Sequence, residues 1–372
     1  RFGRGHFSTL RAFGRCCHRE RCSRPRELEV MDGNRADPVH NFEFGGRYTS
    51  QPEIDHSGIT VDNYFVHPQP ALTAHSSRVR CHSAWMDSAP FVGSEALANG
   101  LVTRQQLRGH FRRIYRDVYI DPNSVLDAPT KARAAWLYSR GRAVVSGLSA
   151  AAVHGSGWIS ADHDAELLWA EHRRQFDGLR IGFDELLPEE VESVDGLVVT
   201  TAARTAYDLG RRRPFGTAVA RLDALCRATG VGVHDIARLA ENHRGARGIV
   251  QLRAVLAVVD AGAESPQETR TRLALMEAGL PRPQTQIEVV GPDGRVFARI
   301  DIGWARWKVA VEYDGEQHWS DERQRAWDIE RQYLLEELGW TVIRVSAMQL
   351  RTDPWEVAAR VRDKLRAAGA KV

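Results

Sequence analysis

The chain has 372 residues, with 51 Lys or Arg against 48 Asp or Glu. At roughly 100 to 200 residues per domain, this length predicts two or three domains and excludes a single small domain. No run approaches the roughly 18 consecutive apolar residues of a membrane-spanning helix, so we expect a soluble protein without a membrane partner.

The basic excess lies at the N-terminus, where the first 85 residues hold 12 arginines and 9 acids. The remainder is formally neutral, which excludes a generally cationic nucleic-acid coat, so any DNA binding requires local patches. Residues 1–88 lack the apolar core of a secretory signal and any periodicity, and we expect a disordered leader. Two interpretations stay open: sequence not native to the protein, or a targeting or nucleic-acid-binding tail.

Cysteine use points to the cellular compartment. Four of the five cysteines lie in the leader, and only Cys226 lies beyond it. One cysteine cannot form an internal disulfide framework, so we expect an intracellular, cytoplasmic protein.

The first structured segment is predicted to contain two short helices and a β-ribbon. Residues 94–100 form a helix pattern closed by Asn-Gly, residues 104–109 form a second one after Thr103, and residues 110–120 suggest a ribbon. This is the order of a winged helix-turn-helix. Positive charge concentrates here, as phosphate contacts require, on Arg104, Arg108, Arg112, Arg113 and Arg116. The alternative is a solvated face of a small packing module.

Three segments together resemble a known family. They are GSEALANGLVTRQQLRGHFRRIYRDVYIDP, SGLSAAAVHG and VVTTAARTAYDLG. They are similar to abortive-infection type IV antitoxin-like proteins of the actinobacterial type. The resemblance implies a winged-helix DNA-binding or regulatory module over residues 90–125, a domain of helices and strands over 126–255, and a cognate toxin as a partner.

Polar residues of the middle segment are interpreted as structural. Ser149 is expected to cap a helix that ends near His154, since no nucleophile elbow surrounds the serine. Thr201 is expected to begin another helix, on which Arg204 and Asp208 form an i,i+4 pair.

The strongest signals lie after residue 262. Ser265 as N-cap, Pro266 and Glu268 begin a predicted helix that closes at Gly279. Strands are predicted over 285–290, 295–302 and 308–314, a helix over 321–338, a strand over 341–345 and a final helix over 353–368. The order is α-β-β-β-α-β-α.

Acids interrupt the apolar strands of this segment. Glu312 and Asp314 share one face of the third strand, and Asp301 ends its hairpin neighbour. Half-buried acids on such strands are costly unless they are paired or bind a metal. An oxygen cluster suits Mg²⁺, with Asp301 and Glu312 as ligands, and Glu268 from the helix could position a metal-bound water.

This arrangement of elements and acids resembles the PD-(D/E)XK nuclease fold, and VEYDGEQHW with RQYLLEELGWTVIRV is similar to its very-short-patch-repair (Vsr-like) branch. The resemblance covers residues 262–372 and implies a metal-dependent endonuclease using Mg²⁺ or Mn²⁺. The sequence departs from the signature at Asp314, where lysine is usual. His318 is then the candidate general acid or base and Gln317 would orient water or DNA. Structural alternatives make Glu268 a helix-dipole partner and Arg331 an i,i+3 partner of Asp328.

The predicted fold class is mixed α/β (α+β), with a restriction-endonuclease-like C-terminal domain and a winged-helix-type N-terminal module. The predicted function is hydrolysis of DNA phosphodiester bonds in repair or in defence against phage and mobile elements. The rival is a non-enzymatic DNA-binding antitoxin or transcriptional regulator whose inactive nuclease fold serves as a dimerisation module, which implies a homodimer. Catalysis on RNA stays open as a third hypothesis.

Overall fold

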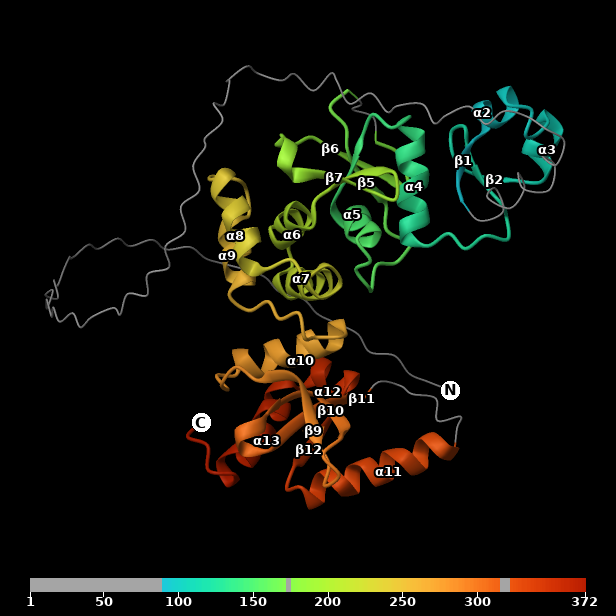
Figure 1. Ribbon diagram of the computed structural model, residues 1–372. Coiled ribbons are helices and arrows are strands. Elements are labelled where there is room, and N and C mark those ends of the chain that lie inside the picture. Colours follow the sequence, from blue (N-terminus) through green and yellow to red (C-terminus); the bar gives the residue numbers. More distant parts are fainter. Residues whose placement is uncertain (1–88, 172–174, 315–321) are drawn as a thin grey trace, which may run out of the picture. The chain divides into compact units, whose positions relative to one another are not determined.

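The computed structural model describes residues 89–171, 175–314 and 322–372 (Figure 1), so the expected leader lies outside the described residues. Within these ranges, no helix combines the length and the apolar character that crossing a membrane requires. Three sheets organise the described chain, with three, five and four strands.

The N-terminal module has the two short helices and the ribbon that the sequence predicts. Helix α2 (Gly93–Ala98) and helix α3 (Arg104–Gly109) precede β2 (Arg112–Tyr115) and β3 (Val118–Ile120), and β1 (Phe91–Val92) completes a sheet of order β1-β3-β2. Thr103 begins α3 through a capping box with Gln106. Apolar residues of β1, of both helices and of the turn between them form a small core, namely Phe91, Ala96, Val102 and Leu107.

The middle segment folds around a five-stranded sheet of order β6-β5-β4-β8-β7. Its strands are β4 (Val144–Val145), β5 (Ala165–Leu168), β6 (Leu179–Gly182), β7 (Val191–Val194) and β8 (Leu197–Thr200). Its helices are α4 (Ala128–Tyr138), α5 (Gly147–Val153), α6 (Ala202–Gly210), α7 (Phe215–Thr229), α8 (Val233–Asn242) and α9 (Ile249–Leu256). Helices α6 to α9 bury a second apolar cluster around Leu209, Leu222 and Leu252.

Two structural expectations for this segment have different outcomes. Thr201 caps α6, and Arg204 pairs with Asp208 at 3.0 Å, as predicted. The expectation for Ser149 is wrong, because Ser146 is the N-cap of α5. Ser149 lies inside the helix, where its hydroxyl accepts a hydrogen bond from the Glu166 backbone N–H at 2.9 Å.

The C-terminal segment contains α10 (Pro266–Glu277), a mixed sheet and three further helices (Figure 1). The sheet order is β12-β11-β10-β9, with only the β11–β12 pair parallel. The strands are β9 (Gln284–Val290), β10 (Val296–Trp304), β11 (Val309–Asp314) and β12 (Thr341–Ser346). The later helices are α11 (Glu322–Glu337), α12 (Ala347–Thr352) and α13 (Pro354–Ala367). All predicted elements are present, and α12 is an addition.

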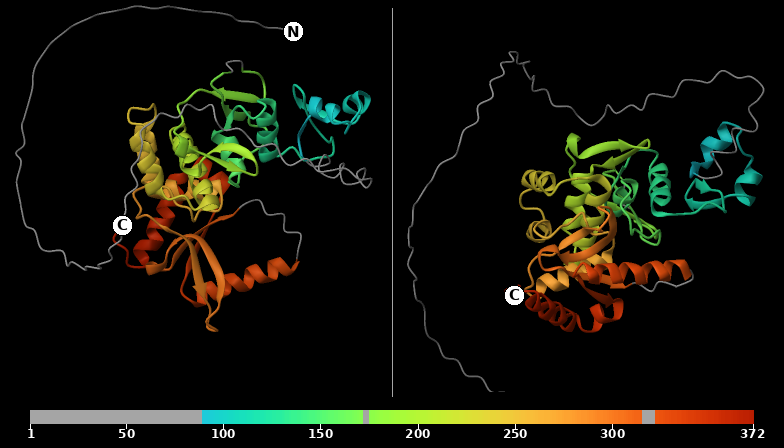
Figure 2. Two further views of the ribbon diagram at one scale, coloured as in Figure 1. Left: turned by 45° about the horizontal axis from the view of Figure 1, so that its top comes forward. Right: turned by 60° about the horizontal axis from the view of Figure 1, so that its bottom comes forward.

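Helices cover both faces of this sheet, and the left view of Figure 2 shows α11 and α13 on opposite sides of the strands. One apolar cluster joins β10 and β11 to α10 and α13, and the other joins β9, β10 and β11 to Leu335 of α11. Strand β10 contributes to both: Ile302 packs in the first cluster and Ile300 in the second. The strand therefore changes faces at Asp301, the residue between them.

A buried ion pair joins α7 to α10. Asp223 of α7 accepts hydrogen bonds from the Arg272 guanidinium and the Thr269 hydroxyl, both at 2.8 Å. Arg272 also donates to the Val258 carbonyl at 2.5 Å. Both charged side chains are almost fully excluded from solvent. Because the two charges neutralise each other, the pair holds α10 against α7 on the side of the helix that faces away from the sheet.

Candidate active site

Glu268 lies in the first turn of α10 and has a local structural role. Ser265 caps the helix by accepting the Glu268 N–H at 3.2 Å, and its hydroxyl donates back to the Glu268 carboxylate at 2.9 Å. The same carboxylate accepts the Glu264 N–H at 2.8 Å. The side chain is buried. The predicted cap is thereby confirmed, and Glu268 combines the helix-start role with a place beside the other acids.

Asp301 and Glu312 face each other across two antiparallel strands. The β10–β11 register pairs Ile302 with Val311, and continuing it by one residue sets Asp301 opposite Glu312. Both side chains are half-buried. The hairpin therefore brings together the two acids that the sequence selected as ligands.

Glu312 is held by Arg331, which reaches it from α11. The guanidinium binds both carboxylate oxygens, with Nη1 to Oε2 at 3.2 Å, and Nη2 also donates to the Arg299 carbonyl at 3.3 Å. The expected i,i+3 pairing of Arg331 with Asp328 is wrong for this reason. The hydrogen bonds to Glu312 raise the pKa of the Arg331 guanidinium. A cation thus stands next to the acids, although the usual lysine is Asp314.

Asp301 differs from both neighbours because no described residue donates a hydrogen bond to it or forms an ion pair with it. Burial raises the pKa of its carboxyl to about 7, and the negative charges of Glu268 and Glu312 add to the increase. A half-buried acid that repels its neighbours is unfavourable as an anion. Such a group gains most from a bound cation.

Gln286 is a residue of this site that the sequence did not reveal. It lies on β9 opposite Asp301 in the strand register, with a positive φ of 51°. Its amide donates to Glu268 at 3.1 Å, while its buried Oε1 finds no hydrogen-bond partner among the described residues. An unsatisfied carbonyl oxygen beside carboxylates is a suitable ligand for a hard cation or its water. Nothing in the sequence marks a glutamine on a strand as a site residue.

The donor set fits a divalent cation held by few protein ligands. Among the described residues, no three His, Cys, Asp or Glu side chains converge as a preformed metal cluster. Mg²⁺ usually takes one or two carboxylates and keeps several waters. Asp301 and the free oxygen of Gln286 meet that requirement, whereas Arg331 already neutralises Glu312.

The remaining predicted site residues are dispersed. Asp314 ends β11 with an exposed side chain. Gln317 and His318 lie outside the described residues. The five arginines of the N-terminal module are all exposed, as a phosphate-contacting surface requires, at Arg104, Arg108, Arg112, Arg113 and Arg116.

Comparisons with known proteins agree with this C-terminal architecture. Residues 251–365 match the REase_MTES_1575 family, which is restriction endonuclease-like. No solved structure matches the chain. Two proteins of Mycobacterium tuberculosis, Uncharacterized protein Rv2248 (strain H37Rv) and Uncharacterized protein MT2308 (strain CDC 1551), are each 30% identical to it over 182 residues. The match covers 48% of this chain and 67% of each relative. The chain therefore belongs to the family of these two mycobacterial proteins and carries a restriction-endonuclease-like domain at its C-terminus.

Proposed function

We propose that the C-terminal domain is a DNA endonuclease that hydrolyses phosphodiester bonds with Mg²⁺ or Mn²⁺. The observation that carries the proposal is Asp301, a half-buried acid without a partner among the described residues, flanked by Glu268 and Glu312. Restriction endonuclease-like folds generally use these metals, and nuclease activity is what the matched family suggests. DNA is the corresponding substrate.

Each acid has a role in this proposal. Asp301 would hold the metal together with Glu312, which would share its charge between Arg331 and the ion, and the unsatisfied Oε1 of Gln286 would bind the ion or its water. Glu268 and Asp314 would support the water shell or a second ion. When bound, a divalent cation supplies Lewis-acid stabilisation of the phosphate charge. Arg331 orients Glu312 through both carboxylate oxygens and adds positive charge where the scissile phosphate would lie.

Two residues outside the described ranges complete the proposal. His318 would transfer protons during attack of water on the phosphodiester, because imidazole titrates near neutral pH. Gln317 would orient water or DNA. They stand three and four residues after Asp314 in the sequence.

The test is cleavage by the full chain of supercoiled plasmid, single-stranded DNA and RNA, with Mg²⁺, Mn²⁺ or EDTA. We expect metal-dependent nicking of DNA that is lost in Asp301→Asn and Glu312→Gln. The matched control is Asp363→Asn, which removes an exposed acid from α13 and should cleave normally. Cleavage that persists in EDTA or in Asp301→Asn would reject the assignment.

A second function is favoured by one observation: Arg331 already neutralises Glu312. The chain could instead be a non-enzymatic antitoxin or transcriptional regulator that binds DNA through the N-terminal module and a cognate toxin elsewhere, with the nuclease fold as a dimerisation module. This function predicts that alanines at Arg112, Arg113 and Arg116 abolish DNA binding. It also predicts that alanines at Asp301 and Glu312 change nothing.

A further inference from the structure

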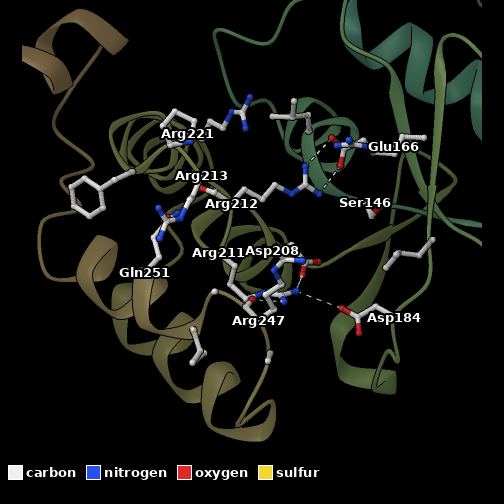
Figure 3. Close-up of a pocket in the computed structure, with 18 of the residues that line it drawn as sticks. Ser146, Glu166, Asp184, Asp208, Arg211, Arg212, Arg213, Arg221, Arg247 and Gln251 are labelled. Carbon is white, nitrogen blue, oxygen red and sulfur yellow. Dashed lines mark hydrogen bonds and ion pairs between the residues drawn. The ribbon is translucent and has the colours of Figure 1, made fainter. Parts of the chain in front are cut away.

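The middle domain contains a large charged cavity, far in sequence from the acids described above. Its volume is about 1630 Å³, and it is lined by β5, β6, the end of α6, the start of α7 and the loop into α9 (Figure 3). Six of its lining residues are arginines, namely Arg180, Arg211, Arg212, Arg213, Arg221 and Arg247. Four are acids, namely Asp164, Glu166, Asp184 and Asp208. The lining thus carries a net positive charge.

Arginines that point to these acids already neutralise most of the negative charge. Arg212 binds both oxygens of buried Glu166, at 2.8 and 2.6 Å. Gly147 allows this pair to form, because a Cβ there would lie 1.8 Å from the Glu166 carboxylate. Arg211 binds Asp208 at 2.6 Å and approaches Asp184 at 3.5 Å. Figure 3 shows these two charged groups as separate clusters on the cavity wall.

Four arginines remain without an acid. Arg180, Arg213, Arg221 and Arg247 have no carboxylate within ion-pair distance among the described residues. Arg221 is the most informative, because it is half-buried rather than extended into solvent. Burial lowers the pKa of its guanidinium, the nearby positive charge of Arg212 lowers it further, and the negative charge of Glu166 offsets only part of this decrease. Two cations that share one carboxylate would both be stabilised by a further anion in the cavity.

The cavity wall also offers aromatic surface beside these charges. Phe215 lines the cavity and is 38% exposed. Phe215 begins α7, two residues after Arg213 and six before Arg221. Guanidinium groups and an exposed ring in one cavity are a combination that binds phosphate and stacks a base. A cavity of this volume exceeds the roughly 300–1,000 Å³ of a typical small-ligand site.

We propose that this cavity binds nucleotide units, with Arg213 and Arg221 contacting phosphate and the ring of Phe215 contacting the base. The unit could come from a free nucleotide or from a segment of single-stranded nucleic acid, since both present the same phosphate and base. The proposal is independent of cleavage, because no residue of the candidate active site lines the cavity.

The test measures binding to the full chain in EDTA, which prevents metal-dependent cleavage. The probes are a fluorescent ATP analogue and a fluorescein-labelled oligothymidylate, read by fluorescence anisotropy. The Arg213→Ala/Arg221→Ala variant should weaken binding of at least one probe tenfold or more. The matched control is Arg238→Ala, which removes an exposed arginine from α8 of the same domain and should bind like the parent.

Two comparisons keep the outcome specific to the cavity. Loss of ATP-analogue binding identifies a free nucleotide as the ligand, and loss confined to the oligonucleotide identifies single-stranded nucleic acid. An alanine variant at Arg112, Arg113 and Arg116 measures binding through the N-terminal module. If the cavity variant binds both probes like Arg238→Ala, or if only the N-terminal variant loses affinity, the proposal is overturned. Equal urea midpoints of the parent and the cavity variant exclude misfolding as the cause.

Discussion

Replacing Asp301 with asparagine should stabilise the protein while abolishing its cleavage of DNA. The folded-state pKa of Asp301 is about 7, against an ordinary value of 3.8, because burial and the charges of Glu268 and Glu312 disfavour the anion. An acid whose pKa is raised by folding binds its proton more tightly in the folded state. Its contribution to stability is therefore lost as pH rises from about 4 to 7. An uncharged amide avoids this loss.

The size of the effect follows from the two pKa values. At about 1.4 kcal/mol per pH unit, the raised pKa of Asp301 lowers the free energy of unfolding by at most about 4 kcal/mol at pH 8 and about 2 kcal/mol at pH 5. Asp301→Asn should thus raise the free energy of unfolding more at pH 8 than at pH 5, by about 2 to 3 kcal/mol.

The assay is urea denaturation of the parent and the variant at both pH values, with hydrogen exchange of β10 amides to locate the change. Asp363→Asn, on the exposed surface of α13, is the control and should shift stability by less than about 0.5 kcal/mol at either pH. Equal gains at pH 5 and pH 8, or a destabilised variant, would refute the conclusion that burial and the neighbouring acids disfavour the Asp301 anion.

Three further outcomes can be measured. Alanines at Arg112, Arg113 and Arg116 should make the slope of log K against log salt for duplex-DNA binding shallower, by about 0.9 per lost phosphate contact. An unchanged slope would mean that these arginines do not contact phosphate. Arg272→Met leaves Asp223 buried without its cation and should destabilise by about 3–5 kcal/mol in urea denaturation, whereas the double variant with Asp223→Asn should recover part of the loss. Gly210→Ala sets a Cβ 2.4 Å from Leu252 and should lower the melting temperature at a cost of about 1–3 kcal/mol, while Gly109→Ala, with open space around it, should not.

The C-terminal elements could be predicted because their signals are local. Ser265, Pro266 and Glu268 begin α10 as the capping pattern indicates, and alternation of apolar residues in β11 separates Glu312 from Val311. Such patterns depend on neighbours within four residues. The hairpin between β10 and β11 then brings Asp301 to Glu312 without further information.

Contacts between segments that are distant in the sequence cannot be predicted from such local patterns. Arg331 pairs with Glu312 rather than Asp328 because α11 packs across the sheet face that carries Glu312. Gln286 joins the site because the β9–β10 register sets it opposite Asp301, and its backbone there has a positive φ that the sequence does not predict. The arginines of the cavity come from positions 180 to 247, so only the folded chain gathers them.

The buried pair between Asp223 and Arg272 determines where the protein can be truncated without losing buried contacts. A fragment starting at residue 262 would keep Arg272 but lose Asp223 and the carbonyl of Val258, two acceptors that its guanidinium uses inside the protein. Arg282, which donates to the carbonyls of Ala257 and Val259, would lose its acceptors too. The helix that carries Glu268 therefore packs against the middle domain, and the nuclease-like fold depends in part on buried contacts with the residues that precede it.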